Sequence, residues 1–226
     1  MGAIVRDSLK LSIRGWFEKS ETIKKLLVSC KRLVKHFRKS VIVSNALEEK
    51  QKQMGSKENS LIIDCETSWN SSYDMLERLL EQRFSVYAVL HDPAVTKMAD
   101  ARSLNLTDHQ LKIIEGLVPV LKPLYFATRT MCSELYPTVG GIYPILFSII
   151  NHHLAENAQD TPAVAKFKKD VHSDLMKRYH IDSDEITSSL SVICTFLDPR
   201  NRSLPFLTEP QRNLVHESVL ERVDAL

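Results

Sequence analysis

Hydrophobic positions recur every three or four residues over most of this 226-residue chain. Residues at i, i+3, i+4 and i+7 fall on one side of a helix, so this spacing predicts amphipathic α-helices. The clearest case is 20–40, where seven apolar residues form one stripe. These are Ile23, Leu26, Leu27, Cys30, Leu33, Val34 and Phe37. We predict one long helix there, packed by this stripe.

The same periodicity predicts helices over 45–54, 72–90 and 162–180, and from 210 to the C-terminus. In the helix over 72–90, the apolar face is expected to include Phe84 and Tyr87, and Ser71 or Ser72 can cap its start. Short polar or glycine-containing stretches separate these segments, so most of the chain is expected to be helical.

Thr107 is placed to cap a helix over 108–135, which Pro119 and Pro123 should kink or divide. The segment 140–154 is apolar on most sides, so we expect a central helix with Leu146 and Ile149 deeply buried. This pattern predicts a well-packed helical core in the second half of the chain.

Two segments leave room for strands. "LIID" (61–64) has the apolar run of a short strand, and "SLSVICTFL" (189–197) fits either a short helix or a strand. The predicted fold class is therefore mainly α, a multi-helix domain with at most one or two short strands.

Charge is distributed unevenly. Through residue 60 the chain has 14 Lys+Arg against 6 Asp+Glu, whereas the other 166 residues have 16 against 22. We therefore divide the chain into a basic helical segment (1–60) and a helical domain (61–226) that packs as one unit. Five cations of the first helix lie off its apolar stripe and are candidate DNA contacts: Lys24, Lys31, Arg32, Lys35 and Lys39. The alternative is that they only solvate the helix.

Catalytic motifs are absent from the sequence. No G-x-S-x-G nucleophile turn and no phosphate-binding glycine loop occurs, and the four cysteines lack the short spacing of a zinc site. We expect buried thiols, no metal site and no small-molecule substrate. Asp64 and Asp198 end predicted elements, which turn and capping chemistry explains. No secretory signal or membrane-length apolar run is present, so an intracellular protein is expected.

One stretch resembles a known family. "CETSWNSSYDMLERLLEQR" (65–83) is similar to the C-x-T-R-W-N-S-x-x-x-M-L-x-R segment of hAT-superfamily transposases and their domesticated relatives, above all the vertebrate BED-type zinc-finger proteins. "LTDHQLKIIEGLVPVLKPLYFAT" and "LDPR" follow in the same order, and the resemblance covers about 9–220. It implies a ribonuclease-H-like core interrupted by an all-helical insertion, of which this chain is chiefly the insertion.

The resemblance gives Trp69 two alternative roles. In active transposases the tryptophan stacks on a flipped base, and base stacking on an aromatic ring contributes about 1–3 kcal/mol. The alternative is that Trp69 packs the start of the following helix against the core. Ser68 stands where the family has arginine, which removes a phosphate-binding cation and favours packing.

The resemblance also implies that the catalytic carboxylates lie outside Met1–Leu226, so we expect no enzymatic activity. The BED finger, with its zinc, and the dimerisation region are expected outside the chain as well, which leaves no cofactor within it. The implied role is DNA binding and transcriptional regulation in the nucleus. The alternative is a helical scaffold for protein partners. Partners would be DNA, other proteins or a second copy, and not a membrane.

Overall fold

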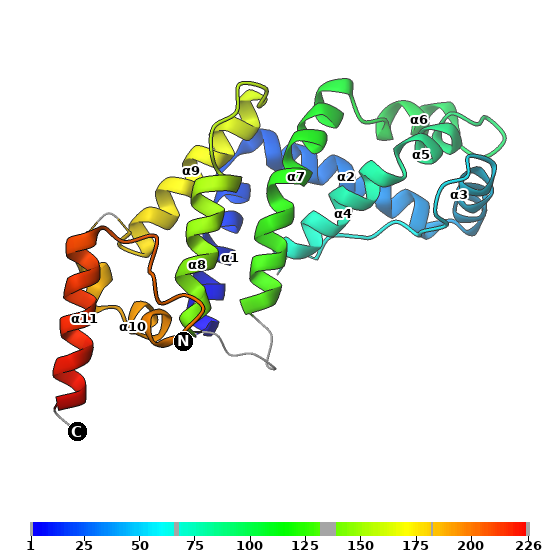
Figure 1. Ribbon diagram of the computed structural model, residues 1–226. Coiled ribbons are helices and arrows are strands. Elements are labelled where there is room, and N and C mark those ends of the chain that lie inside the picture. Colours follow the sequence, from blue (N-terminus) through cyan, green and yellow to red (C-terminus); the bar gives the residue numbers. More distant parts are fainter. Residues whose placement is uncertain (1, 66–67, 132–138, 182, 225–226) are drawn as a thin grey trace. The chain divides into compact units, whose positions relative to one another are not determined.

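The computed structural model describes residues 2–65, 68–131, 139–181 and 183–224. Within these ranges the chain forms eleven α-helices and no strand (Figure 1). The helices are α1 (Gly2–Lys19), α2 (Glu21–Lys39), α3 (Val41–Gln53), α4 (Trp69–Glu81), α5 (Arg83–Leu90), α6 (Met98–Leu104), α7 (Asp108–Met131), α8 (Ile142–Ser148), α9 (Pro162–Arg178), α10 (Leu190–Leu197) and α11 (Glu209–Asp224). The mainly α fold class is thereby confirmed. None of the described helices is both long and apolar enough to cross a bilayer.

Two compact units make up the chain. The first comprises Met1–Ile13, Pro123–Ala158 and Ala165–Leu226, and the second comprises Arg14–Lys122 and Gln159–Val164. The charge distribution suggests a division at residue 60. This position falls inside the second unit, so the division stays a prediction about composition.

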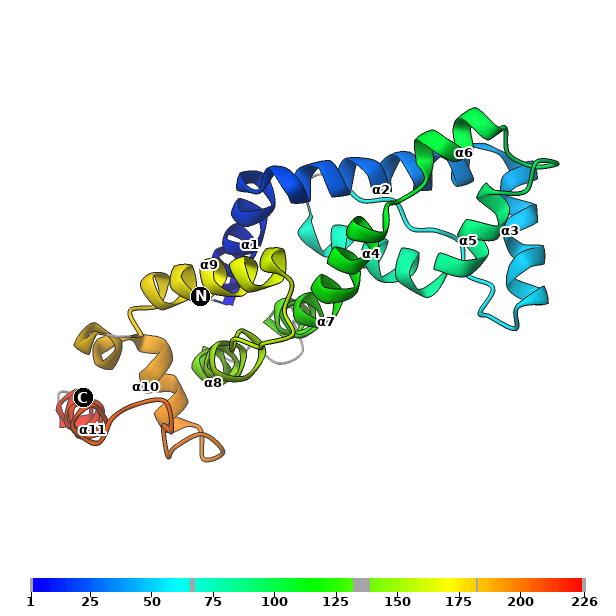
Figure 2. The ribbon, with the colours of Figure 1, turned by 90° about the horizontal axis from the view of Figure 1, so that it is seen from above.

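The apolar stripe of α2 is buried as predicted. Six of its seven residues are shielded from solvent: Ile23, Leu26, Cys30, Leu33, Val34 and Phe37. In the second unit α2 contacts α3, α4 and α6, and α3 also packs against α5 (Figures 1 and 2). The stripe therefore provides the core of this unit and turns the cations of α2 away from it.

Sequence periodicity missed two helices, α1 and α6. α1 buries Leu9, Ile13, Trp16 and Phe17, which lie at i, i+4, i+7 and i+8. This apolar spacing is visible in the sequence. It was overlooked because α1 ends at Lys19, directly before the stronger apolar pattern of α2. α6 is only seven residues long, too short to show a clear period.

The predicted helix over 72–90 is two helices, α4 and α5, joined at Gln82. The chain turns there because the Gln82 side chain is buried and bonded to neighbouring segments instead of following the stripe. After this turn α5 buries Ser85, Val86, Val89 and Leu90. The expected burial of Phe84 and Tyr87 was therefore wrong, since both are exposed.

α7 is one helix from Asp108 to Met131, so Pro119 and Pro123 do not divide it, and the alternative of a kink stays a prediction. Proline removes a backbone donor and crowds the preceding turn. Close packing compensates, because Leu117 and Leu121 are fully buried on either side of Pro119. Thr107 caps the helix as predicted: its Oγ1 accepts from Gln110 N–H at 3.2 Å.

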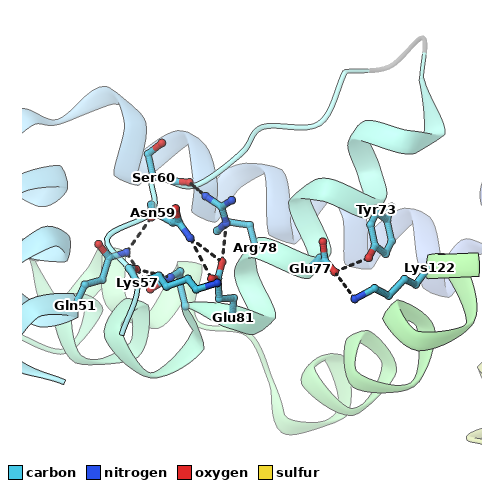
Figure 3. A network of polar contacts seen from close by, with 10 residues as sticks. Gln51, Lys57, Asn59, Ser60, Tyr73, Glu77, Arg78, Glu81 and Lys122 are labelled. Atoms are coloured by element: carbon cyan, nitrogen blue, oxygen red, sulfur yellow. Dashed lines mark hydrogen bonds and ion pairs between the residues drawn. The ribbon is translucent and has the colours of Figure 1, made fainter. Parts of the chain in front are cut away.

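Residues 61–64 do not form the predicted strand. The preceding extended backbone, 57–60, is instead bonded to helix side chains, as Figure 3 shows. Gln51 Nε2 of α3 donates to Asn59 O at 2.9 Å, and Arg78 Nη1 of α4 donates to Ser60 O at 2.8 Å. A β-strand would need a neighbouring strand to bond its backbone. Here side chains of α3 and α4 bond the backbone of residues 57–60 instead.

The first unit is centred on α8 and α10. Leu146 is fully buried and Ile149 is 2% exposed, which confirms both predictions. The helix continues past Ser148 as a π-helical turn, Ile149–His153, and 189–197 proves to be helical as α10. α10 packs on the short 3-10 turn Val139–Gly141. A Cβ on Gly140 would lie 2.8 Å from Cys194 O, so this contact requires glycine.

Candidate nucleic-acid interface

Trp69 is the first residue of α4 and lies in the second unit. Its side chain is 3% exposed, and its Nε1 has no hydrogen-bond partner. It lines a surface hollow of about 360 Å³ together with Phe17, Leu27 and Val28. Burial of both ring faces supports the packing alternative, because a base can stack only on an open face.

Asp64 fixes the wall of this hollow. Its Oδ2 lies 2.9 Å from Lys31 Nζ, and its Oδ1 accepts from Ser71 Oγ at 2.9 Å and from Ser72 Oγ at 3.0 Å. The carboxylate is 4% exposed. The two serines therefore bind Asp64 and do not cap α4, whose N-cap residue is Ser68.

Three of the six predicted DNA contacts come together at the hollow: Trp69, Lys24 and Lys31. Both lysines have acidic partners. Lys24 Nζ lies 2.8 Å from Glu21 Oε1, and this contact lowers the pKa of the Glu21 carboxyl. Lys31 holds Asp64 and is 22% exposed. The charge that these two lysines present to a ligand is thus partly neutralised.

The other three predicted contacts, Arg32, Lys35 and Lys39, lie outside the hollow and are exposed. Among the described residues, none of them has an acidic partner within ion-pair distance. At about 100° per residue they follow Lys24 and Lys31 along one side of α2. We call these five residues the basic stripe.

Among the residues that the structure describes, carboxylates do not converge on one site. No group of three His, Cys, Asp or Glu side chains in the described ranges could hold a metal ion. Asp64 belongs to the second unit and Asp198 to the first. Asp198 follows α10 in the predicted turn, where Arg200 donates to its Oδ1 from Nε at 3.0 Å and to its Oδ2 from Nη2 at 2.7 Å. These bonds lower the pKa of Asp198 to about 2.

The cysteines differ from one another. Cys30 is buried in the core, which raises the pKa of its thiol to about 12, and Cys194 is half-buried. Cys65 is exposed and lines the hollow, so its predicted burial was wrong. The chain emerges here from the extended segment before α4 and leaves the side chain at the surface. Cys132 lies outside the described residues.

Sequence reasoning missed the contribution of α1 to the hollow. Arg14, Phe17 and Glu18 line it from the C-terminal half of α1. Arg14 and Glu18 form an exposed ion pair at 2.8 Å. The signal that could have found these residues is the spacing of Leu9, Ile13 and Phe17, which predicts a helix ending near Ser20.

Comparison with known families now assigns the fold. The family model of the ZBED1 RNase-like helical domain matches residues 3–115, half of the chain. The chain belongs to this family. The matched residues of this chain, 3–115, include Trp69, Asp64 and the whole basic stripe. The resemblance to the middle region of hAT-derived, BED-type proteins is thereby confirmed.

Two relatives extend the match beyond residue 115. Human zinc finger BED domain-containing protein 4 is 21% identical over 214 residues, or 95% of this chain and 17% of that protein. Mouse zinc finger BED domain-containing protein 6 is 26% identical over 199 residues, or 84% of this chain and 19% of that protein. The chain thus spans less than a fifth of the length of these curated relatives.

Proposed function

We propose that this chain is a catalytically inactive, transposase-derived domain that binds the DNA backbone through the basic stripe of α2. Its role would be transcriptional regulation in the nucleus, within a protein whose zinc lies in a BED finger. The observation that carries the proposal is the line of exposed, unneutralised cations Arg32, Lys35 and Lys39. The names of both relatives, which refer to a BED zinc finger, support it.

The dimensions of the stripe suit a DNA backbone. Lys24 and Lys39 are fifteen residues apart on α2, so the stripe is about 22 Å long at 1.5 Å per residue. One DNA strand carries a phosphate about every 3.4 Å of axis. Several phosphates therefore come within reach of the stripe, and its contacts would be independent of sequence.

Fluorescence anisotropy with a short labelled duplex at two salt concentrations tests the proposal. About three phosphate contacts give a slope near −2 to −3 in log K against log salt, since each contributes about −0.9. Changing Arg32, Lys35 and Lys39 together to Glu should flatten this slope. Lys31 is left unchanged, because a glutamate there would face buried Asp64.

The matched control changes Lys166, Lys169 and Lys177 of α9 to Glu, which alters the net charge equally on exposed residues of the first unit. DNA affinity should survive in this variant. Absence of binding at the lower salt, or equal loss in both triple variants, would contradict a DNA-binding stripe. The second candidate function, a scaffold for protein partners, is favoured by an exposed aromatic surface on α5.

A further inference from the structure

α5 presents two large aromatic rings to solvent. Phe84 is 66% exposed and Tyr87 is 57% exposed. Each ring is held by a neighbour: the Arg83 guanidinium lies 4.7 Å above the Phe84 ring, and Tyr87 stacks on His91 with ring centroids 4.1 Å apart. Rings fixed in this way lose little side-chain entropy when a partner covers them.

Beside these rings lies an apolar groove of about 480 Å³, lined by residues of α2, α4, α5 and α7 and by residues just before α7. Its floor is made of buried side chains, namely Leu33, Leu79, Val86, Leu90 and Leu106. This volume is within the range of about 300–1,000 Å³ typical of ligand pockets. All of its residues belong to the second unit.

Two carboxylates mark the α7 side of the groove. Asp108 and Glu115 are seven residues apart on α7, with Leu111 between them, and all three line the groove. Seven residues are two helical turns, so the two positions lie on one side, about 10 Å apart. Glu115 Oε1 accepts from Arg83 Nη1 at 2.5 Å. Asp108 has no cationic partner among the described residues.

We propose that this groove binds an amphipathic helix of a partner protein, with its apolar side chains against Phe84, Tyr87 and Leu111. The helix would carry a Lys or Arg that reaches Asp108, and a second one two turns away beside Glu115. A helix laid in an apolar groove is a recurrent mode of peptide recognition. Nucleic acid does not fit this surface, because Asp108 repels phosphates and Arg83 is already paired with Glu115, which leaves the groove with a net negative charge.

This groove is separate from the basic stripe. Leu33 forms part of the groove floor, and at about 100° per residue it lies roughly 100–180° around α2 from the five cations of the basic stripe. The two surfaces therefore use different sides of α2. The inference goes beyond the proposed DNA binding and can fail or succeed independently of it.

Anisotropy with two labelled peptides about four turns long tests the groove. Both carry Leu on one face, and they differ only in having Lys or Glu at flanking positions. The full chain should bind the Lys peptide at least about tenfold more tightly than the Glu peptide. Phe84→Ser should weaken Lys-peptide binding about tenfold or more, as expected for a central aromatic anchor. Asp108→Lys should shift the preference toward the Glu peptide.

Phe126→Ser is the matched control, since Phe126 is 54% exposed on the part of α7 that belongs to the first unit. It should leave peptide binding unchanged, and Phe84→Ser should leave the DNA salt slope unchanged. Equal affinity for the two peptides, or equal loss in both serine variants, would overturn the proposal. The groove could instead be occupied by a second copy of the chain, and sedimentation of the chain alone tests this. Self-association that Phe84→Ser abolishes would overturn the partner-helix proposal and assign the groove to a second copy.

Discussion

Asp64 shows how one buried carboxylate organises its surroundings. It joins α2 to the start of α4 through Lys31, Ser71 and Ser72. Burying a charge is unfavourable unless it is paired and hydrogen-bonded, and these three partners meet that requirement. Asp64 therefore fixes the start of α4, where Trp69 lies, against α2.

Replacing Asp64 by Asn should lower the free energy of unfolding by about 2–4 kcal/mol, because the ion pair with Lys31 and the charged hydrogen bonds from Ser71 and Ser72 are lost in a largely buried site. Urea denaturation followed by circular dichroism measures this change. Glu18→Gln is the control, since its pair with Arg14 is exposed and contributes at most about 0.5 kcal/mol. Equal effects of the two substitutions would show that Asp64 is not a structural anchor.

Asp198 gives a prediction about pH. Hydrogen bonds from Arg200 lower its pKa in the folded protein to about 2, below its ordinary value of 3.8. The unfolded chain therefore binds the proton more tightly, and the stability that Asp198 contributes is complete above about pH 4. It should be lost as the pH falls from about 4 to about 2.

The measurement compares thermal midpoints of the unaltered chain and Asp198→Asn over this pH range. The difference between them should be constant above pH 4 and shrink toward pH 2. A difference that is the same at every pH would show that the Arg200 contact does not depend on ionised Asp198.

At the scale of elements, the segment before α4 is fixed by a buried pair of amides. Gln51 Nε2 donates to Gln82 Oε1 at 2.9 Å, and Gln82 Nε2 donates to Lys57 O at 2.9 Å. Gln51 is fully buried and Gln82 is 1% exposed. The pair links α3, the α4–α5 junction and the extended backbone.

Gln82→Ala should lower the free energy of unfolding by about 1–3 kcal/mol, because Gln51 Nε2 and Lys57 O each lose one of two hydrogen bonds in a buried site. Chemical denaturation provides the value. Gln53→Ala, at an exposed position of α3, should change stability by less than about 0.5 kcal/mol. If Gln82→Ala were equally mild, side-chain bonds would not be what fixes residues 57–60.

Periodicity predicted those elements whose packing is set by one continuous stripe. α2 is the example, because its apolar and charged residues separate cleanly around the helix. It failed where a polar residue decides the geometry. Gln82 is polar, so no pattern in the sequence indicates that it is buried and divides α4 from α5. Pro119 gave the opposite error. The sequence suggested that α7 could divide there, but tertiary packing keeps the helix continuous.

The candidate site was predictable in part, for a similar reason. The cations of α2 were identified because they lie off the apolar stripe, and most of them are exposed as expected. Lys31 was grouped with them, but its pairing with Asp64 depends on a contact between residues 33 positions apart. The groove beside Phe84 could not be predicted, because it exists only after the turn at Gln82.

For the whole chain we expect no DNA cleavage. Two-metal phosphoryl transfer requires acidic residues that converge on a pair of ions, whereas Asp64 and Asp198 are engaged by Lys31 and Arg200 in different units. Supercoiled plasmid incubated with the chain and Mg²⁺ or Mn²⁺ should remain intact on a gel. Nicking that disappears with Asp64→Asn or Asp198→Asn would contradict this expectation.

The placement of the basic stripe and the groove on different sides of α2 has one further consequence. A helix is about 10–12 Å across, so a duplex on the basic stripe and a partner helix in the groove would be separated by little more than that width. Neither ligand would use a side chain needed by the other. The domain would then hold the partner protein beside DNA at a high effective concentration. No change in the conformation of the domain would be required.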